Sequence, residues 1–154
     1  MKKELISSWM EVAIKQAELA YQADEVPVGA IIIDDKGKMI GRGYNQCESL
    51  CDPTAHAEMI AITAATSTLG NWRLNGCSLF VTKEPCLMCT GAIVNARISS
   101  LYFGVYDPVK GCCGSAYQLC MDPIINSTTS YMGGVLENKC QSLLADYFTK
   151  KRVK

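Results

Sequence analysis

The stretch "NGCSLFVTKEPCLMCTGAIVNARISSLYFGVY", residues 75–106, predicts a strand, a helix and a second strand in succession. An apolar run that follows a turn signal predicts the first strand, over 75–82. Pro85 is favoured in the first turn of a helix, and we expect this helix to run to about Arg97. Residues 99–106 form another apolar run and predict the second strand. This order of elements is typical of α/β proteins.

The residues upstream of this stretch predict four further elements. Apolar residues at helical spacing, strand-like runs around a turn, and a helix-start signal indicate them. They are an amphipathic helix over 3–22, a hairpin of two strands over 26–34 and 38–45, and a helix that starts at Asp52-Pro53-Thr54 and ends at Thr66.

Downstream, residues 115–121 predict a short helix and residues 124–130 an irregular polar segment. Residues 131–136 are compatible with a fifth strand or an extended connector, and a closing helix is expected from Glu137 to about Arg152. The whole order predicts a three-layer α/β/α sandwich around a mixed sheet of about five strands. We expect a single domain over residues 1–154.

The charge and hydropathy of the chain exclude a general attraction to polyanions. The formal net charge is zero, with 49% hydrophobic and 19% charged residues, so any attraction to nucleic acid has to be local. No apolar run reaches the length of about 18 residues that a membrane span needs, and the first residues lack the pattern of a secretory signal. We therefore expect a cytoplasmic protein without membrane association.

The chain contains nine cysteines, and an odd number cannot all be paired in disulfides. Disulfides are rare in the cytoplasm. We expect most of these thiols to be small core residues and a minority to bind metal.

Cys86 and Cys89 are spaced so that both thiols lie on one side of a helix, close to its start, where the helix dipole favours thiolate. His56, the only histidine, also stands at a predicted helix start. The ends of neighbouring strands in an α/β sheet bring such helix starts together. The pattern therefore predicts a zinc site made by His56, Cys86 and Cys89.

Three protein ligands leave a fourth position for water, which is typical of catalytic zinc. Glu58, two residues after His56, is then placed to accept a proton and return it. Two alternatives are less specific: a lone histidine packed in the core, and a redox-active or structural cysteine pair. A third is a closed structural site with Cys47 or Cys51 as the fourth ligand.

The chain resembles the cytidine-deaminase-like zinc deaminases, and within them the bacterial tRNA adenosine deaminases. The blocks that carry the resemblance include "EVPVGAIII", "DPTAHAEMIA", "EPCLMCTGAIVNARI" and "FGVYDP". The resemblance implies one zinc ion per subunit, held by the three predicted ligands, with Glu58 as the proton shuttle. It also implies that Asn45 hydrogen-bonds the target base, that Val28 forms an apolar wall, and that the Ala57 N–H orients the attacked ring.

The reaction implied by this resemblance is hydrolytic deamination of adenosine to inosine at the wobble position of a tRNA anticodon stem-loop. A homodimer is implied as well. The C-terminal segment places Lys150, Lys151, Arg152 and Lys154 beside Tyr147 and Phe148. Cations neutralise phosphate and rings stack on bases, so Phe148 and Lys151 are candidate RNA contacts, although cations are also common at helix C-termini. Asp107 is either an acceptor for a ribose 2′-hydroxyl or a turn residue before Pro108.

Two other functions use the same features. A free nucleobase deaminase, acting on guanine or cytosine, has the same fold and motif, and a non-catalytic zinc or RNA-binding module is the alternative from another class. The chain also departs from the tRNA deaminases that it resembles. Lys83 stands where an apolar residue is common, and Cys112 and Cys113 occupy a loop usually built of small residues such as alanine.

Overall fold

The fold is built on one five-stranded sheet, seen in a computed structural model that describes residues 1–125 and 127–153. The strands lie in the order β2-β1-β3-β4-β5. Their bounds are β1 Gly29–Ile33, β2 Met39–Tyr44, β3 Ser78–Lys83, β4 Ser100–Val105 and β5 Ser130–Met132. The helices are α1 Lys3–Gln22, α2 Cys47–Leu50, α3 Ala57–Leu69, α4 Leu87–Asn95 and α5 Glu137–Val153.

The sheet is mixed, as predicted. β1 pairs antiparallel with β2 and β3, whereas β4 pairs parallel with β3 and β5. Every residue of β1 is buried, which its continuous apolar sequence "GAIII" requires, because both faces of a central strand are covered.

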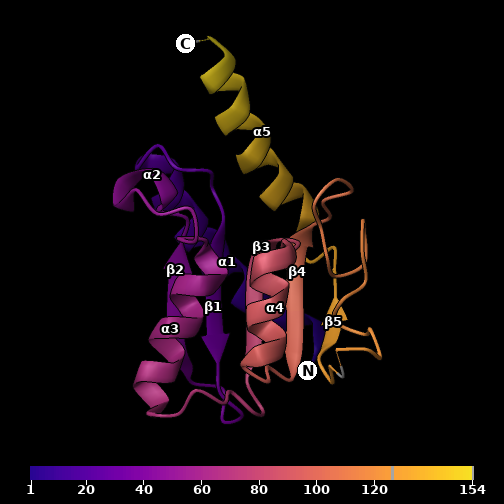
Figure 1. Cartoon of the computed structure of the whole chain (residues 1–154). Helices are drawn as coiled ribbons and strands as arrows, with labels where there is room; N and C mark the ends of the chain where they lie inside the picture. The colour runs from indigo at the N-terminus through magenta and orange to yellow at the C-terminus, as the bar shows by residue number, and fades with distance from the viewer. Residues whose placement is uncertain (126, 154) are drawn as a thin grey trace.

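Helices cover both faces of the sheet and confirm the three-layer architecture. In Figure 1, α3 and α4 lie side by side over one face and α1 lies behind the sheet. α5 packs against β4 and α1 and then projects beyond the end of the sheet. α3 and α4 begin at the same end of the molecule, so the residues that precede them are brought together there.

Two glycines allow α3 to lie directly on β2. A Cβ added to Gly41 would lie 2.4 Å from the carbonyl oxygen of Ala61, and one added to Gly43 would lie 2.7 Å from that of Ala57. Both distances are shorter than any normal contact. The missing side chains therefore fix the separation between strand and helix, and with it the position of the start of α3.

The predicted helix start at Asp52-Pro53-Thr54 is wrong. The chain forms the short helix α2 first, and Asp52 Oδ1 then accepts hydrogen bonds from the backbone N–H and the hydroxyl of Thr54, at 2.8 and 2.7 Å. This local turn uses the carboxylate that would otherwise cap a helix. α3 begins only at Ala57, with His56 as the residue before it.

Other boundaries also differ from the predictions. α4 begins at Leu87, so Cys86 precedes the first turn and only Cys89 lies inside it. Residues 115–121 form no helix, because the loop folds back on itself through a bridge between Cys113 and Gln118 and a bond from Gly114 N–H to Tyr117 O. The fifth strand is confirmed but short, and Asn126 and Lys154 lie outside the described residues. Among the described helices, none combines the length and apolar character needed to cross a membrane.

Candidate active site

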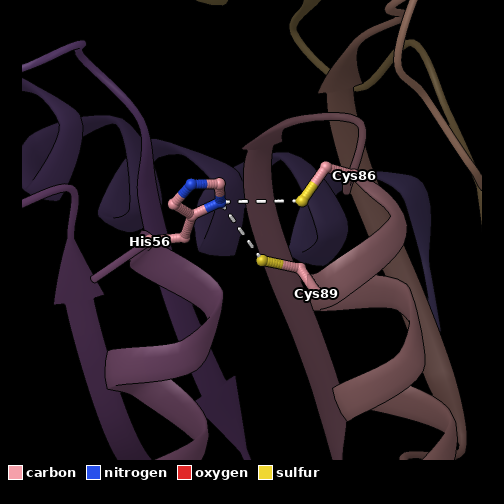
Figure 2. A group of neighbouring side chains, drawn as sticks. All are labelled: His56, Cys86 and Cys89. Atoms are coloured by element: carbon pink, nitrogen blue, oxygen red, sulfur yellow. Dashed lines mark hydrogen bonds between the residues drawn. The ribbon is translucent and has the colours of Figure 1, made fainter. Parts of the chain in front are cut away.

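Three metal-binding side chains meet where α3 and α4 begin. Figure 2 shows the His56 ring pointing across the gap between the two helices toward both cysteines. His56 Nδ1 lies 3.6 Å from the Cys86 sulfur and 3.5 Å from the Cys89 sulfur. The ligand atoms of all three residues lie within 4.8 Å of one another, and no other such group of three or more occurs in the part of the chain that the structure describes.

These separations fit a tetrahedral zinc site. Bonds of about 2.3 Å from zinc to sulfur and about 2.05 Å from zinc to nitrogen, at a tetrahedral angle, place sulfur and nitrogen about 3.5 Å apart. The two observed distances agree with that value. The three donors, one imidazole and two sulfurs, are also the set that zinc prefers over magnesium or calcium.

The electrostatics of the group favour a negative sulfur even before a metal is bound. A hydrogen bond from the Cys89 thiol, together with the bond to His56, lowers the pKa of Cys86 to about 3 against the opposing effect of burial. The same hydrogen bond and burial raise the pKa of Cys89. The arrangement therefore favours the thiolate form of Cys86, which is the form in which a cysteine would bind zinc.

Glu58 lies in the first turn of α3, next to this group, and only 4% of it is exposed. Burial raises the pKa of Glu58 above its ordinary value. A carboxyl group with a raised pKa is suited to accepting a proton and giving it back at neutral pH.

Glu58 and two of the three ligands line one small pocket. His56, Glu58 and Cys86 line a pocket of about 300 Å³, which is within the range of small-molecule sites. Four of the predicted substrate-binding residues line the same pocket: Val28, Asn45, Asp107 and Phe148.

Asn45 connects the pocket to the metal-binding helix. Its Oδ1 accepts a hydrogen bond of 2.8 Å from the Ala57 N–H, which fixes the orientation of the amide and leaves its NH₂ group as a donor for a ligand. Ala57 itself is fully buried and does not line the pocket, so its N–H is placed to orient Asn45.

Asp107 is engaged from three sides. Its Oδ1 accepts hydrogen bonds from the N–H groups of Val109 and Lys110, which makes it a turn residue, and its Oδ2 lies 3.3 Å from Lys83 Nζ. Lys151 is not brought into the pocket. It forms an ion pair of 2.9 Å with Asp24, and both residues line a separate pocket with Tyr21 and Tyr147.

Two buried carboxylates that the sequence analysis did not single out hold the loops around the pocket. Glu84 accepts hydrogen bonds from the backbone N–H groups of Asp107, Cys113 and Ser115, at 2.9, 3.0 and 3.0 Å. Glu25 accepts bonds from the N–H groups of Glu48 and Ser49, at 3.0 and 2.7 Å. In the sequence, the only indication of a role for either glutamate is its position next to an apolar run that predicts a strand.

The extra cysteines do not complete the metal group. Cys47 lines the pocket and Cys51 is exposed, but neither belongs to the cluster of ligand atoms. Cys113 and Cys120 are buried away from solvent with their sulfurs 3.2 Å apart. Among the described residues, the metal-binding group therefore consists of His56, Cys86 and Cys89.

Comparisons with known proteins agree with this geometry. Residues 3–105 match the family model of the cytidine and deoxycytidylate deaminase zinc-binding region. A tRNA-specific adenosine deaminase of Bacillus subtilis is 40% identical over 146 residues, which cover 95% of this chain and 90% of the relative. A solved structure from work on A-to-I editing by tRNA:A34 deaminases at the wobble position superposes with a TM-score of 0.84 at 40% identity, covering 88% of this chain and 97% of that one.

A guanine deaminase of Bacillus subtilis is a more distant match. It is 36% identical, with a TM-score of 0.62, and the match covers 69% of this chain and 66% of that one. The match to the tRNA-specific adenosine deaminase is higher in identity and covers nearly the whole chain, whereas this match covers about two thirds of it.

Proposed function

The chain belongs to the cytidine and deoxycytidylate deaminase family of zinc-binding proteins, and from that premise we propose that it deaminates the wobble adenosine of a tRNA anticodon loop to inosine. The observation that carries this proposal is the 40% identity with a tRNA-specific adenosine deaminase over 95% of the chain. The free-base alternative has less support, because the guanine deaminase of Bacillus subtilis is 36% identical over 69% of the chain, against 40% over 95% for the tRNA-specific adenosine deaminase.

His56, Cys86 and Cys89 would hold one zinc ion per chain. When bound, zinc supplies a Lewis acid that lowers the pKa of water to about 7. The reaction replaces the C6–N bond of adenine by a C6–O bond, with water consumed and ammonia released.

Glu58 moves the protons of this exchange. Its carboxylate takes a proton from the attacking water and delivers it to the departing amine, which then leaves as neutral ammonia. The burial that raises the pKa of Glu58 suits both steps, because the protonated and ionised forms are then closer in free energy at neutral pH.

The remaining pocket residues hold the base. We assign Asn45 to a hydrogen bond with the purine through its NH₂ group, and Val28, which is 5% exposed, to the apolar wall. Phe148 lines the pocket from α5 and is 43% exposed, so its ring is available to stack on a base. Asp107 and Lys151 are weaker candidates for RNA contacts, because Asp107 already accepts two backbone N–H groups and Lys151 does not line the pocket.

We propose the full assembly on the same basis. Residues 1–154 act as one deaminase domain, two chains form a homodimer, and the enzyme works on tRNA in the cytoplasm. Sedimentation of the purified protein would test the dimer, with a monomer as the contradicting result.

A stem-loop assay tests the proposed activity. The purified protein is incubated with an anticodon stem-loop that carries adenosine at the wobble position, and with a matched stem-loop that carries it at another loop position. We expect inosine in the first RNA only, and none after treatment with a chelator. If no inosine forms while free guanine or cytosine is deaminated readily, the proposed function is wrong.

A further inference from the structure

Lys83 lies on the boundary between two hollows of the surface. It is the last residue of β3, and its side chain lines both the pocket that contains His56 and Glu58 and a neighbouring groove of about 360 Å³. The groove runs between the end of β4 and α5 and is lined by Tyr106, Phe148 and Arg152. The groove therefore offers a path along which a nucleotide chain with one base in the pocket can continue.

The ammonium group of Lys83 is held in place and remains accessible. Its Nζ lies 3.3 Å from Asp107 Oδ2, and one third of the side chain, 33%, is exposed. Asp107 is itself fixed, because Glu84 accepts its backbone N–H at 2.9 Å. An ammonium carries three N–H donors, so one ion pair leaves donors for a second anion.

A cation at this point would offset the acidic residues of the pocket. Glu58, Glu84 and Asp107 line the pocket as acidic residues, and among the residues that the structure describes Lys83 and Lys110 are the lysines that line it. A phosphate that approaches would be repelled by the carboxylates unless a nearby ammonium compensated them. Lys83 is the cation that borders both the pocket and the groove.

We propose that Lys83 binds the backbone phosphate next to the target nucleotide and so forms a specificity-determining contact of this chain. This inference rests on the proposed function, since it requires an RNA substrate. The alternative is that Lys83 only stabilises the loop that begins at Asp107, in which case its removal would affect stability and leave RNA binding unchanged.

The dependence of RNA affinity on salt distinguishes these two roles. Each phosphate neutralised on a single strand contributes about 0.7 to the slope of log affinity against log salt. The Kd of the anticodon stem-loop is measured at salt concentrations between about 50 and 200 mM for three variants: Lys83→Gln, Lys83→Arg and Lys36→Gln. Lys36 is an exposed lysine in the turn between β1 and β2, so it controls for the same loss of charge elsewhere.

For Lys83→Gln we expect an affinity about fivefold weaker at low salt and a slope reduced by about 0.7. Lys83→Arg should keep the wild-type slope, as should Lys36→Gln. In turnover, KM for the stem-loop should rise more than kcat falls. A Lys83→Gln protein with the wild-type slope and affinity but a lower Tm would overturn the proposal in favour of the stabilising role.

The test is separate from that of the proposed function, because Kd is measured with the Glu58→Gln substitution added to every protein, which blocks turnover of the stem-loop. Wild-type protein that binds the stem-loop with a slope sensitive to Lys83, yet forms no inosine, would refute the deaminase proposal and retain the phosphate contact. If wild-type protein forms inosine but the salt dependence of its affinity does not change when Lys83 is substituted, the deaminase proposal is retained and the phosphate contact is refuted.

Discussion

Glu58 stands two residues after a metal ligand, and its own side chain is placed for a different task. His56 precedes α3 and presents its ring to the two sulfurs, whereas Glu58 lies within the first turn of the helix, buried in the same pocket. Metal binding and proton transfer are thus assigned to separate residues, and a substitution can remove one without the other.

We predict that Glu58→Gln retains zinc and loses at least about 10²-fold in kcat, since glutamine fills the same volume but cannot accept and return a proton. Zinc content by elemental analysis and inosine formation from the stem-loop check the two halves. Glu18→Gln, on the exposed side of α1, is the matched control and should leave both at the wild-type level. Appreciable turnover by Glu58→Gln would refute the assigned role.

At the scale of residues, the grouping of His56, Cys86 and Cys89 could be predicted, because the cysteines are only three residues apart and His56 stands, like Cys86, directly before a helix. The bond between Asn45 and the Ala57 N–H could not, because it joins a strand end to a helix start that only the folded chain brings together. Glu25 and Glu84 were not singled out for the same reason: the N–H groups that justify burying their carboxylates are supplied by residues 23 to 31 positions away.

Among the elements, α2 is too short to be stable alone and depends on Glu25. This carboxylate is 2% exposed and accepts bonds from the N–H groups of Glu48 and Ser49 and from the Ser49 hydroxyl. Burial raises the pKa of Glu25, but these hydrogen bonds together lower it by more than burial raises it. The pKa of Glu25 therefore lies below its ordinary value of 4.5. The ionised form is therefore favoured by folding.

A pH dependence of stability follows. Because the folded-state pKa of Glu25 is depressed, its contribution is fully present above pH 4.5 and is lost as the pH falls through the folded-state value. We expect Glu25→Gln to lower the free energy of unfolding by about 2 kcal/mol at neutral pH and by progressively less in acid. Urea denaturation of both proteins across this range is the measurement, and a difference that stays constant with pH would contradict it.

The contact between β2 and α3 gives a second prediction at this scale. Gly43→Ala would place a methyl group against the carbonyl oxygen of Ala57, at 2.7 Å if nothing moved. We expect a loss of about 1–3 kcal/mol in the free energy of unfolding, together with weaker zinc binding, because the start of α3 must shift. Gly91→Ala, where an added Cβ meets nothing within 4 Å, is the control and should be neutral or slightly stabilising. Equal effects of the two substitutions would contradict this account.

The predicted order of elements is confirmed apart from the helix over 115–121 and the unpredicted α2, because apolar periodicity is a strong signal for long elements. The start of α3 was misplaced because Asp52-Pro53-Thr54 has the composition of a helix cap, while the side-chain bond from Asp52 to Thr54 closes a turn instead. Composition alone does not separate these two uses of the same residues.

For the molecule as a whole, zinc would link the residues that precede two neighbouring helices, α3 and α4, on one face of the sheet. A metal that binds only the folded state stabilises it, by about 2.7 kcal/mol when present at about 100 times its Kd. For a chain of this length we expect chelation to lower Tm by about 5–10 °C and added zinc to restore it. The Tm of His56→Ala should be close to that of the chelated wild-type protein, and added zinc should not raise it. An unchanged Tm after verified removal of the metal would count against the site.

The layered architecture and the mixed sheet could be predicted from sequence, whereas the surface around the pocket could not. That surface depends on how α5 projects past the sheet and on which lysine meets which carboxylate: Lys83 meets Asp107, and Lys151 meets Asp24 instead of the pocket. Such pairings are set by tertiary distances that no local pattern records.

The account depends most on an open metal site with three protein ligands. Zinc K-edge X-ray absorption on protein loaded with one equivalent of zinc tests this directly. We predict two sulfur ligands at about 2.3 Å and two nitrogen or oxygen ligands at about 2.0–2.1 Å, one of them from solvent. A third sulfur in the coordination shell, as Cys47 would supply, would show a closed structural site and contradict the proposed catalysis.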